Sequence, residues 1–156
     1  DEGTLKIATT ENQIAFDFEG ILLVSKLIEG SYPNYKQVIP AQFEERITIE
    51  REALLTATRR AALVASEHSN SVKLKFSKNK LEIISNTPEI GESKESLPIK
   101  YSGKEISIAF NPTYLMDPLR ALPDDEIYFE ASDDLSPGVI KASIPFLYVL
   151  MPMRMA

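Results

Sequence analysis

Apolar and polar residues alternate along the first part of the chain, the pattern of half-buried β-strands. Three such runs fall within residues 4–28, separated by turn residues at 11–12 and 19–20. This pattern predicts three antiparallel strands with no helix among them to cover a face. Residues 30–40 carry two Pro and two Tyr and predict a tethered connection.

A different pattern starts at Arg46 and combines both kinds of element. Residues 46–50 alternate as in a strand, and residues 50–66, rich in Ala and Leu, form the strongest helical segment of the chain. Further strands are predicted at 72–76, 81–84 and 92–101. The segment therefore predicts a strand–helix–three-strand unit.

The same unit recurs after a shift of 59 residues, which lays residues 47–49 over 106–108 without a gap. The second copy predicts a helix over 112–122 with Asn111 as its N-cap and Pro112 at its first position. Its strands are predicted at 126–131, 139–144 and 147–151.

The opening segment belongs to the same repeat, because a shift of 67 residues lays Leu5 and Ile7 over Val72 and Leu74. We interpret it as the strand half of a third unit, whose own strand and helix would lie upstream. Repeated units inside a domain bury each other's apolar faces. The predicted fold class is α+β, with pseudo-repeated strand–helix–three-strand units, antiparallel sheets and two helices on one side.

Composition narrows the possible functions. The 156 residues are 44% hydrophobic, enough for a sizeable core, and include no cysteine, which excludes disulfides, thiolate catalysis and Cys-ligated metals. No apolar run approaches the roughly 20 residues of a membrane span. The net charge of −6 argues against binding DNA by bulk electrostatic attraction.

Candidate catalytic chemistry is sparse. Paired carboxylates occur at 44–45, 124–125 and 133–134, which leaves a small carboxylate-dependent hydrolase as an alternative, although adjacent acids on a strand point to opposite faces. The single histidine, His68, lies in a polar loop without a nucleophile motif. We therefore predict no catalytic residue, no metal site and no cofactor.

The last residues form an apolar run in which Val149 and Leu150 predict a final strand that Pro152 ends. Met151, Met153 and Met155 alternate with Pro152 and Arg154 beyond it. Two interpretations stay open: a core strand with a frayed end, or a flexible Met-rich rim that accepts partners of different shapes.

This run, Y-V-L-M-P-M-R-M at 148–155, resembles the C-terminus of the bacterial DNA polymerase sliding clamp, the beta subunit of polymerase III. The segments S-Y-P-N-Y-K-Q-V-I-P at 31–40, K-Y-S-G at 100–103 and A-F-N-P-T-Y at 109–114 also resemble that family, in the same order. The resemblance covers nearly the whole chain. It implies a DNA-clamp fold and a non-catalytic processivity factor, cytoplasmic and nucleoid-associated.

The resemblance also implies a domain assignment. Residues 1–38 would be the C-terminal strand half of clamp domain 2 with the interdomain connection, and residues 39–156 would be domain 3. The full-length homodimeric ring would encircle double-stranded DNA without sequence preference. A chain of residues 1–156 alone, lacking domain 1, would be a monomer or weakly associated.

In clamps, the polymerase, clamp-loader subunits and repair proteins dock linear motifs into a cleft between domains 2 and 3. Matched residue by residue, this cleft would comprise Pro33, Gln37, Val38, Asn111, Tyr114, Leu135, Pro137, Val149, Leu150, Met151, Pro152, Met153, Arg154 and Met155. Two positions depart from the family: Gln37 stands where a basic residue is common, and Ser69 where an aromatic can sit. The wall from early domain 2 is absent from this chain.

Two further surfaces follow from the resemblance. Arg51, Arg59, Arg60 and Arg120 on the two predicted helices are candidates to face DNA in the pore, or are ordinary solvated residues. Leu63 and Val64 match the surface through which clamp rings close head to tail, or are core residues.

Overall fold

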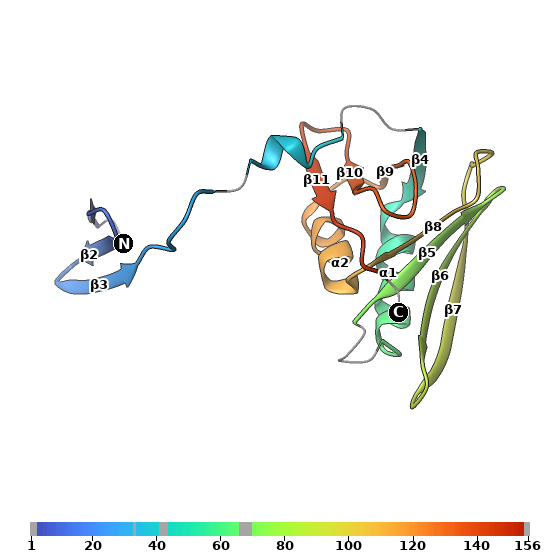
Figure 1. The fold of residues 1–156 in the computed structure, drawn as a ribbon, viewed down its shortest axis with the longest axis horizontal. Helices are drawn as coiled ribbons and strands as arrows, with labels where there is room; N and C mark the ends of the chain where they lie inside the picture. The colour runs from blue at the N-terminus through green and yellow to red at the C-terminus, as the bar shows by residue number, and fades with distance from the viewer. Residues whose placement is uncertain (1–2, 33, 41–43, 66–69, 155–156) are drawn as a thin grey trace. The chain divides into compact units, whose positions relative to one another are not determined.

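The structure, a computed structural model, describes residues 3–32, 34–40, 44–65 and 70–154 (Figure 1). The chain divides into two compact units, Asp1–Asn34 and Tyr35–Ala156. This division lies a few residues before the predicted domain boundary at residue 38. No helix of the described residues is long and apolar enough to cross a membrane.

The first unit is a three-stranded antiparallel sheet of β1 (Leu5–Thr9), β2 (Gln13–Phe18) and β3 (Ile21–Lys26), paired in that order. These are the three strands that the alternating pattern predicts. Apolar side chains of β1 and β3 are exposed within this unit, including Ile7 and Ile21. A sheet of this kind requires a covering layer to bury them.

The second unit repeats one order of elements twice. Its elements are the 3-10 helix η1 (Tyr35–Gln37), β4 (Glu45–Glu50), α1 (Arg51–Ala62), β5 (Val72–Ser77), β6 (Lys80–Thr87), β7 (Gly91–Pro98), β8 (Ile106–Phe110), α2 (Pro112–Ala121), β9 (Glu126–Ala131), β10 (Gly138–Lys141) and β11 (Leu147–Leu150). The predicted strand–helix–three-strand repeat is confirmed.

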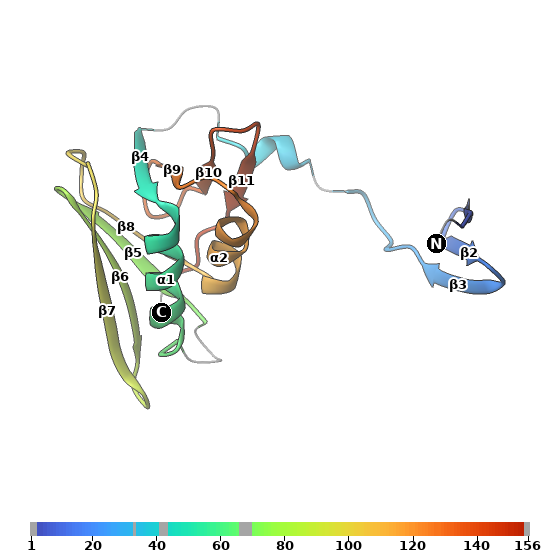
Figure 2. The same cartoon turned by 180° about the vertical axis from the view of Figure 1, so that it is seen from behind.

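The two copies exchange their first strands. One sheet has the order β11-β10-β9-β4 and the other β7-β6-β5-β8, so that β4 of the first copy pairs with β9 of the second, and β8 of the second with β5 of the first. All the pairings are antiparallel. Figures 1 and 2 show α1 and α2 side by side, with α1 between α2 and the sheet of β5 to β8.

The core lies where the two copies meet. Ile47 pairs with Phe129 across β4 and β9, and the equivalent Ile106 pairs with Phe76 across β8 and β5. The rings of Phe76 and Phe129 stack with centroids 5.3 Å apart, and both side chains are fully buried. The exchange of strands therefore brings equivalent residues of the two copies into contact, so that neither copy has a complete core alone.

Three predicted elements end at least three residues early, and one of them is the strand predicted over 92–101, which ends at Pro98. The first helix ends at Ala62 rather than Ser66, because the N–H groups of Leu63 and Val64 bond to carbonyls three residues back, as in a 3-10 turn; Ser66 itself is outside the described residues. The strand predicted to reach residue 144 ends at Lys141, because the N–H of Ser143 donates to the Asp124 carboxylate instead of to a neighbouring strand.

Candidate functional site

A groove of about 440 Å³ lies between the start of α2 and the chain that leaves β11. It is lined by Asn111, Tyr114, Tyr148, Val149, Leu150, Met151, Pro152 and Met153. The two segments are separate in sequence and meet only in the fold. Seven of the predicted cleft residues, all of these except Tyr148, are thus brought together.

The start of α2 is fixed by its cap. The Asn111 side-chain oxygen accepts a hydrogen bond from the Thr113 N–H at 2.9 Å, and Pro112 occupies the first helical turn. The Pro112 and Leu115 side chains are buried, whereas Tyr114, on the opposite face of the turn, is 59% exposed. The cap therefore presents an aromatic ring at the groove.

The other wall is held from two sides. Leu150 ends β11, pairs with Gly138 of β10 and is buried in the core. Beyond it, the Met153 N–H donates to the carbonyl of Ala109, at the end of β8, at 2.8 Å. Met151, between these two attachments, is 60% exposed. Both interpretations of the tail hold for part of it: Leu150 belongs to the core, and Met151 to an accessible rim.

Tyr148 is a groove residue that the sequence prediction omitted. Burial, together with the nearby Asp117 and Tyr114, raises the pKa of its hydroxyl group. Its ring stacks parallel to that of Phe146, with centroids 6.4 Å apart. Tyr148 belongs to the same apolar C-terminal run as the predicted residues, but the residue-by-residue match to the family started at Val149 and left it out.

The loop between β9 and β10 does not line this groove. Asp133 organises it by accepting bonds from the N–H groups of Leu135 and Ser136 at 2.9 and 2.6 Å, and from the Ser136 hydroxyl at 2.9 Å. Leu135 is 73% exposed and Pro137 half-buried. Their assignment to the cleft stays a prediction.

The remaining predicted cleft residues have different positions. Gln37 ends η1 and Val38 follows it, both exposed. Arg154 is exposed beyond the groove lining. Pro33, Met155 and the departure at Ser69 lie outside the described residues, as does His68. The described groove is therefore one part of the predicted cleft.

Three of the four candidate arginines are engaged by the protein itself. Arg51 donates to the carbonyls of Asp124 at 2.6 Å and Leu119 at 2.8 Å, joining the start of α1 to the end of α2. Arg60 binds Glu95 of β7 through two bonds of 2.9 and 2.6 Å.

Arg120 contacts Asp117 at 3.3 Å and the sulfur of Met116 at 3.8 Å, while about half of its side chain stays exposed. Arg59 is exposed. The geometry therefore gives Arg51 a structural role at the helix pair, whereas Arg59 and Arg120 keep a solvent-facing surface.

The end of α1 is an exposed apolar site. Leu63 is 77% exposed, so it is not a core residue, and Val64 is half-buried. The Val64 carbonyl accepts a bond of 2.6 Å from the Thr87 hydroxyl at the end of β6. Within the described sheet, β7 has an unpaired edge next to this point.

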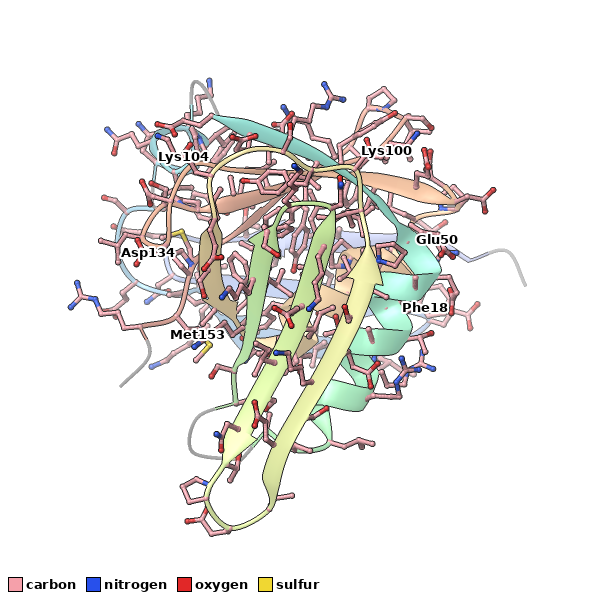
Figure 3. All side chains as sticks on the ribbon, turned by 90° about the vertical axis from the view of Figure 1, so that its right-hand side faces the viewer. Phe18, Glu50, Lys100, Lys104, Asp134 and Met153 are labelled. Carbon is pink, nitrogen blue, oxygen red and sulfur yellow. The ribbon has the colours of Figure 1, made fainter. Side chains whose placement is uncertain are left out.

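The paired carboxylates show no arrangement for acid–base catalysis. A second pocket, of about 440 Å³, includes Glu44, Lys104 and the Asp133–Asp134 pair. Figure 3 labels Lys104 and Asp134 on the same side of the second unit. Glu44 forms an ion pair with Lys104 at 3.3 Å. Bonds from the Leu135 and Ser136 N–H groups and the Ser136 hydroxyl hold the pKa of Asp133 below its usual range, and a general acid requires the opposite shift.

The described part of the chain contains no group of three or more His, Asp or Glu side chains placed to hold a metal ion. The residues that gather at the groove are apolar, aromatic and amide side chains. Such a set binds apolar ligand groups and orients them through a few polar contacts.

Comparison with known proteins agrees with this arrangement. The profile of the C-terminal domain of the DNA polymerase III beta subunit matches residues 36–154. The chain is 36% identical over 155 residues to the beta sliding clamp of Chlamydia pneumoniae, covering 99% of this chain and 42% of that protein. It is 33% identical over 156 residues to the beta sliding clamp of Escherichia coli K12, covering 99% and 43%.

Solved structures give the same result. A DnaN sliding clamp from Bartonella birtlesii bound to griselimycin aligns with a TM-score of 0.82 and 30% identity, over 97% of this chain and 41% of that one. The DNA polymerase III beta subunit of Pseudomonas aeruginosa aligns with a TM-score of 0.81 and 30% identity, over 98% and 43%. The chain spans about two fifths of the length of these relatives. It belongs to the family of DNA polymerase III beta subunits, the beta sliding clamps.

Proposed function

We propose that this chain is the C-terminal part of a processivity clamp, and that its groove binds linear peptide motifs of replication and repair proteins. Residues 1–38 would form the end of clamp domain 2 with the interdomain connection, and residues 39–156 domain 3. The complete protein would encircle double-stranded DNA in the cytoplasm, at the nucleoid, without catalysing a reaction itself.

The observation that carries this proposal is the groove between α2 and the tail. Its volume of about 440 Å³ accommodates one or two large side chains, and Tyr114, Val149 and Met151 supply apolar surface. Asn111 and the backbone of the tail supply polar groups that an extended peptide requires. Pro33, Gln37, Val38, Leu135, Pro137, Arg154 and Met155 are proposed as outer walls of the same cleft.

Replacing Tyr114 by Ala tests the groove directly. We expect the variant to bind a labelled Gln-Leu-Ser-Leu-Phe peptide about 5- to 150-fold more weakly, a loss of roughly 1–3 kcal/mol, because a large apolar contact is removed. Fluorescence anisotropy measures the binding, and circular dichroism checks the fold. Tyr128→Ala on β9, whose ring lies under the Arg46 guanidinium rather than at the groove, is the matched control. Equal affinities for both variants would exclude Tyr114 from the site.

The surface at the end of α1 is proposed to close the ring. Leu63 offers an exposed apolar side chain, and β7 offers a free edge that carries Glu92 and Glu95. Head-to-tail closure joins two different surfaces, and the complementary one would lie on clamp domain 1 of the neighbouring subunit.

We therefore expect this chain to be a monomer at micromolar concentration when measured by multi-angle light scattering. The free edge of β7 is protected from self-pairing by its charged residues, which disfavour edge-to-edge association. A stable dimer of this chain would contradict the assignment of Leu63 and β7 to a surface that requires a different partner.

The proposal assigns the pore to the exposed parts of α1 and α2. Arg59, Arg60 and Arg120 are the candidates with exposed side chains, although Arg60 also pairs with Glu95 and Arg120 with Asp117. Contacts of arginine with phosphates hold DNA without reading bases. The net charge of −6 favours a ring that holds DNA by enclosing it over one that grips it by electrostatic attraction.

A further inference from the structure

The three methionines among the described residues of the second unit fall into two environments. Met151 is 60% exposed and Met153 half-buried, and both line the groove. Met116, on the buried face of α2, is 7% exposed, and its sulfur accepts a hydrogen bond from Arg120 at 3.8 Å. The groove therefore holds accessible thioethers, and the core holds a protected one that serves as an internal reference.

We propose that Met151 and Met153 form a peroxide-sensitive switch, in which oxidation of their sulfur atoms to sulfoxides releases the peptide from the groove. This inference rests on the proposed function of the groove. Hydrogen peroxide transfers one oxygen atom to each sulfur, forming the S–O bond as the O–O bond breaks, and the other oxygen leaves as water. Each sulfur loses two electrons, which the peroxide gains.

The donors that line the groove are the Asn111 amide and the Tyr114 and Tyr148 hydroxyls, whereas the tail around Met151 offers a sulfoxide few donors of its own. The neighbouring side chains of Val149, Leu150 and Pro152 are all apolar. Pro152 has no N–H group, and the N–H of Met153 already donates to the Ala109 carbonyl. An apolar peptide side chain placed over Met151 would cover a polar S–O group without donating a hydrogen bond to it, which is unfavourable.

The same geometry makes the switch reciprocal. A bound peptide covers the sulfur atoms and excludes peroxide, so an occupied groove is oxidised more slowly than an empty one. Methionine sulfoxide is reduced by methionine sulfoxide reductases, with one enzyme for each sulfoxide epimer. The oxidation of methionine to its sulfoxide is therefore reversible. This chain contains no cysteine, whose higher oxidation states form irreversibly.

The test uses the 156-residue chain with Met155→Leu, so that Met155, outside the described residues, does not enter the result. The chain is treated with hydrogen peroxide, oxidised methionines are identified by peptide mass spectrometry, and a labelled Gln-Leu-Ser-Leu-Phe peptide is titrated by anisotropy. We expect Met151 and Met153 to oxidise before Met116, and affinity to fall roughly 10- to 100-fold. Both reductases together should restore it, and thermal unfolding checks that the oxidised chain stays folded.

Two variants locate the effect. In Met151→Leu/Met153→Leu, the affinities before and after peroxide should agree, whatever the starting affinity, whereas Met116→Leu should keep the full loss. The switch would be overturned if Met116 were oxidised as fast as Met151. It would also be overturned if peroxide lowered the peptide affinity of the double variant as much as that of the starting chain. If Met151 and Met153 are fully converted to sulfoxides and the peptide affinity does not change, the switch is overturned but the proposed function is not. An untreated chain that does not bind the peptide overturns the proposed function, and the switch with it.

Discussion

Replacing Phe129 by Ala is expected to lower the free energy of unfolding of the second unit by about 3–5 kcal/mol. Phe129 is fully buried, stacks on Phe76 at 5.3 Å and meets the edge of Phe110 at 6.0 Å. Its removal opens a cavity at the point where the two copies of the repeat exchange strands. Urea denaturation followed by circular dichroism measures the loss.

Phe76→Ala should lower the free energy of unfolding by a similar amount, because Phe76 is the equivalent residue of the other copy. Phe18→Ala on β2 is the control, because it lies in the first unit and should leave the unfolding of the second unchanged. A loss below about 1 kcal/mol for Phe129→Ala would mean that the two copies do not share one core.

The repeat was readable from the sequence because β4 and β8 carry the same alternation of Ile residues, and a helix begins within two residues of the end of each strand. The exchange of these strands was not readable. Periodicity reports which face of a strand is buried, but a strand with one apolar face packs equally well beside either of two similar neighbours. The pairing of Ile47 with Phe129 appears only in the structure.

The groove was predicted in part because its residues lie in short continuous segments that resemble those of the clamp family. Asn111 and Tyr114 are fixed by the start of a helix, and Val149 to Met153 by the end of a strand. Arg51 was proposed to face DNA, but in the structure it donates hydrogen bonds to two backbone carbonyls of a distant segment. A sequence indicates that a helix position is polar, but it does not reveal bonds of this kind. Long-range contacts of one side chain have no periodic signature.

Removing the tail from Met153 onward should weaken peptide binding by about 1–3 kcal/mol, roughly a 5- to 150-fold loss. The truncation takes away Met153, the last lining residue of the groove, and the bond between the Met153 N–H and the Ala109 carbonyl. That bond should contribute on the order of 1 kcal/mol to stability, so the second unit should stay folded. Anisotropy and urea denaturation measure the two quantities separately.

Glu126→Ala is the control for the truncation. Glu126 begins β9 opposite Glu50 and does not line the groove, so peptide affinity should not change. If the truncated chain unfolds, the tail is mainly a core element. If it stays folded and binds as well as the intact chain, the site lies elsewhere.

The central claim is that the groove between α2 and the tail is where a partner peptide binds. The most direct measurement is a titration of the isotope-labelled chain with the Gln-Leu-Ser-Leu-Phe peptide, followed by two-dimensional NMR of the backbone amides. The account predicts that the amide signals of Thr113 and Tyr114 and of residues 148–151 and 153 shift together with one dissociation constant, while those of β6 stay in place. Shifts centred on the pocket of Glu44 and Lys104, with the groove unaffected, would contradict it.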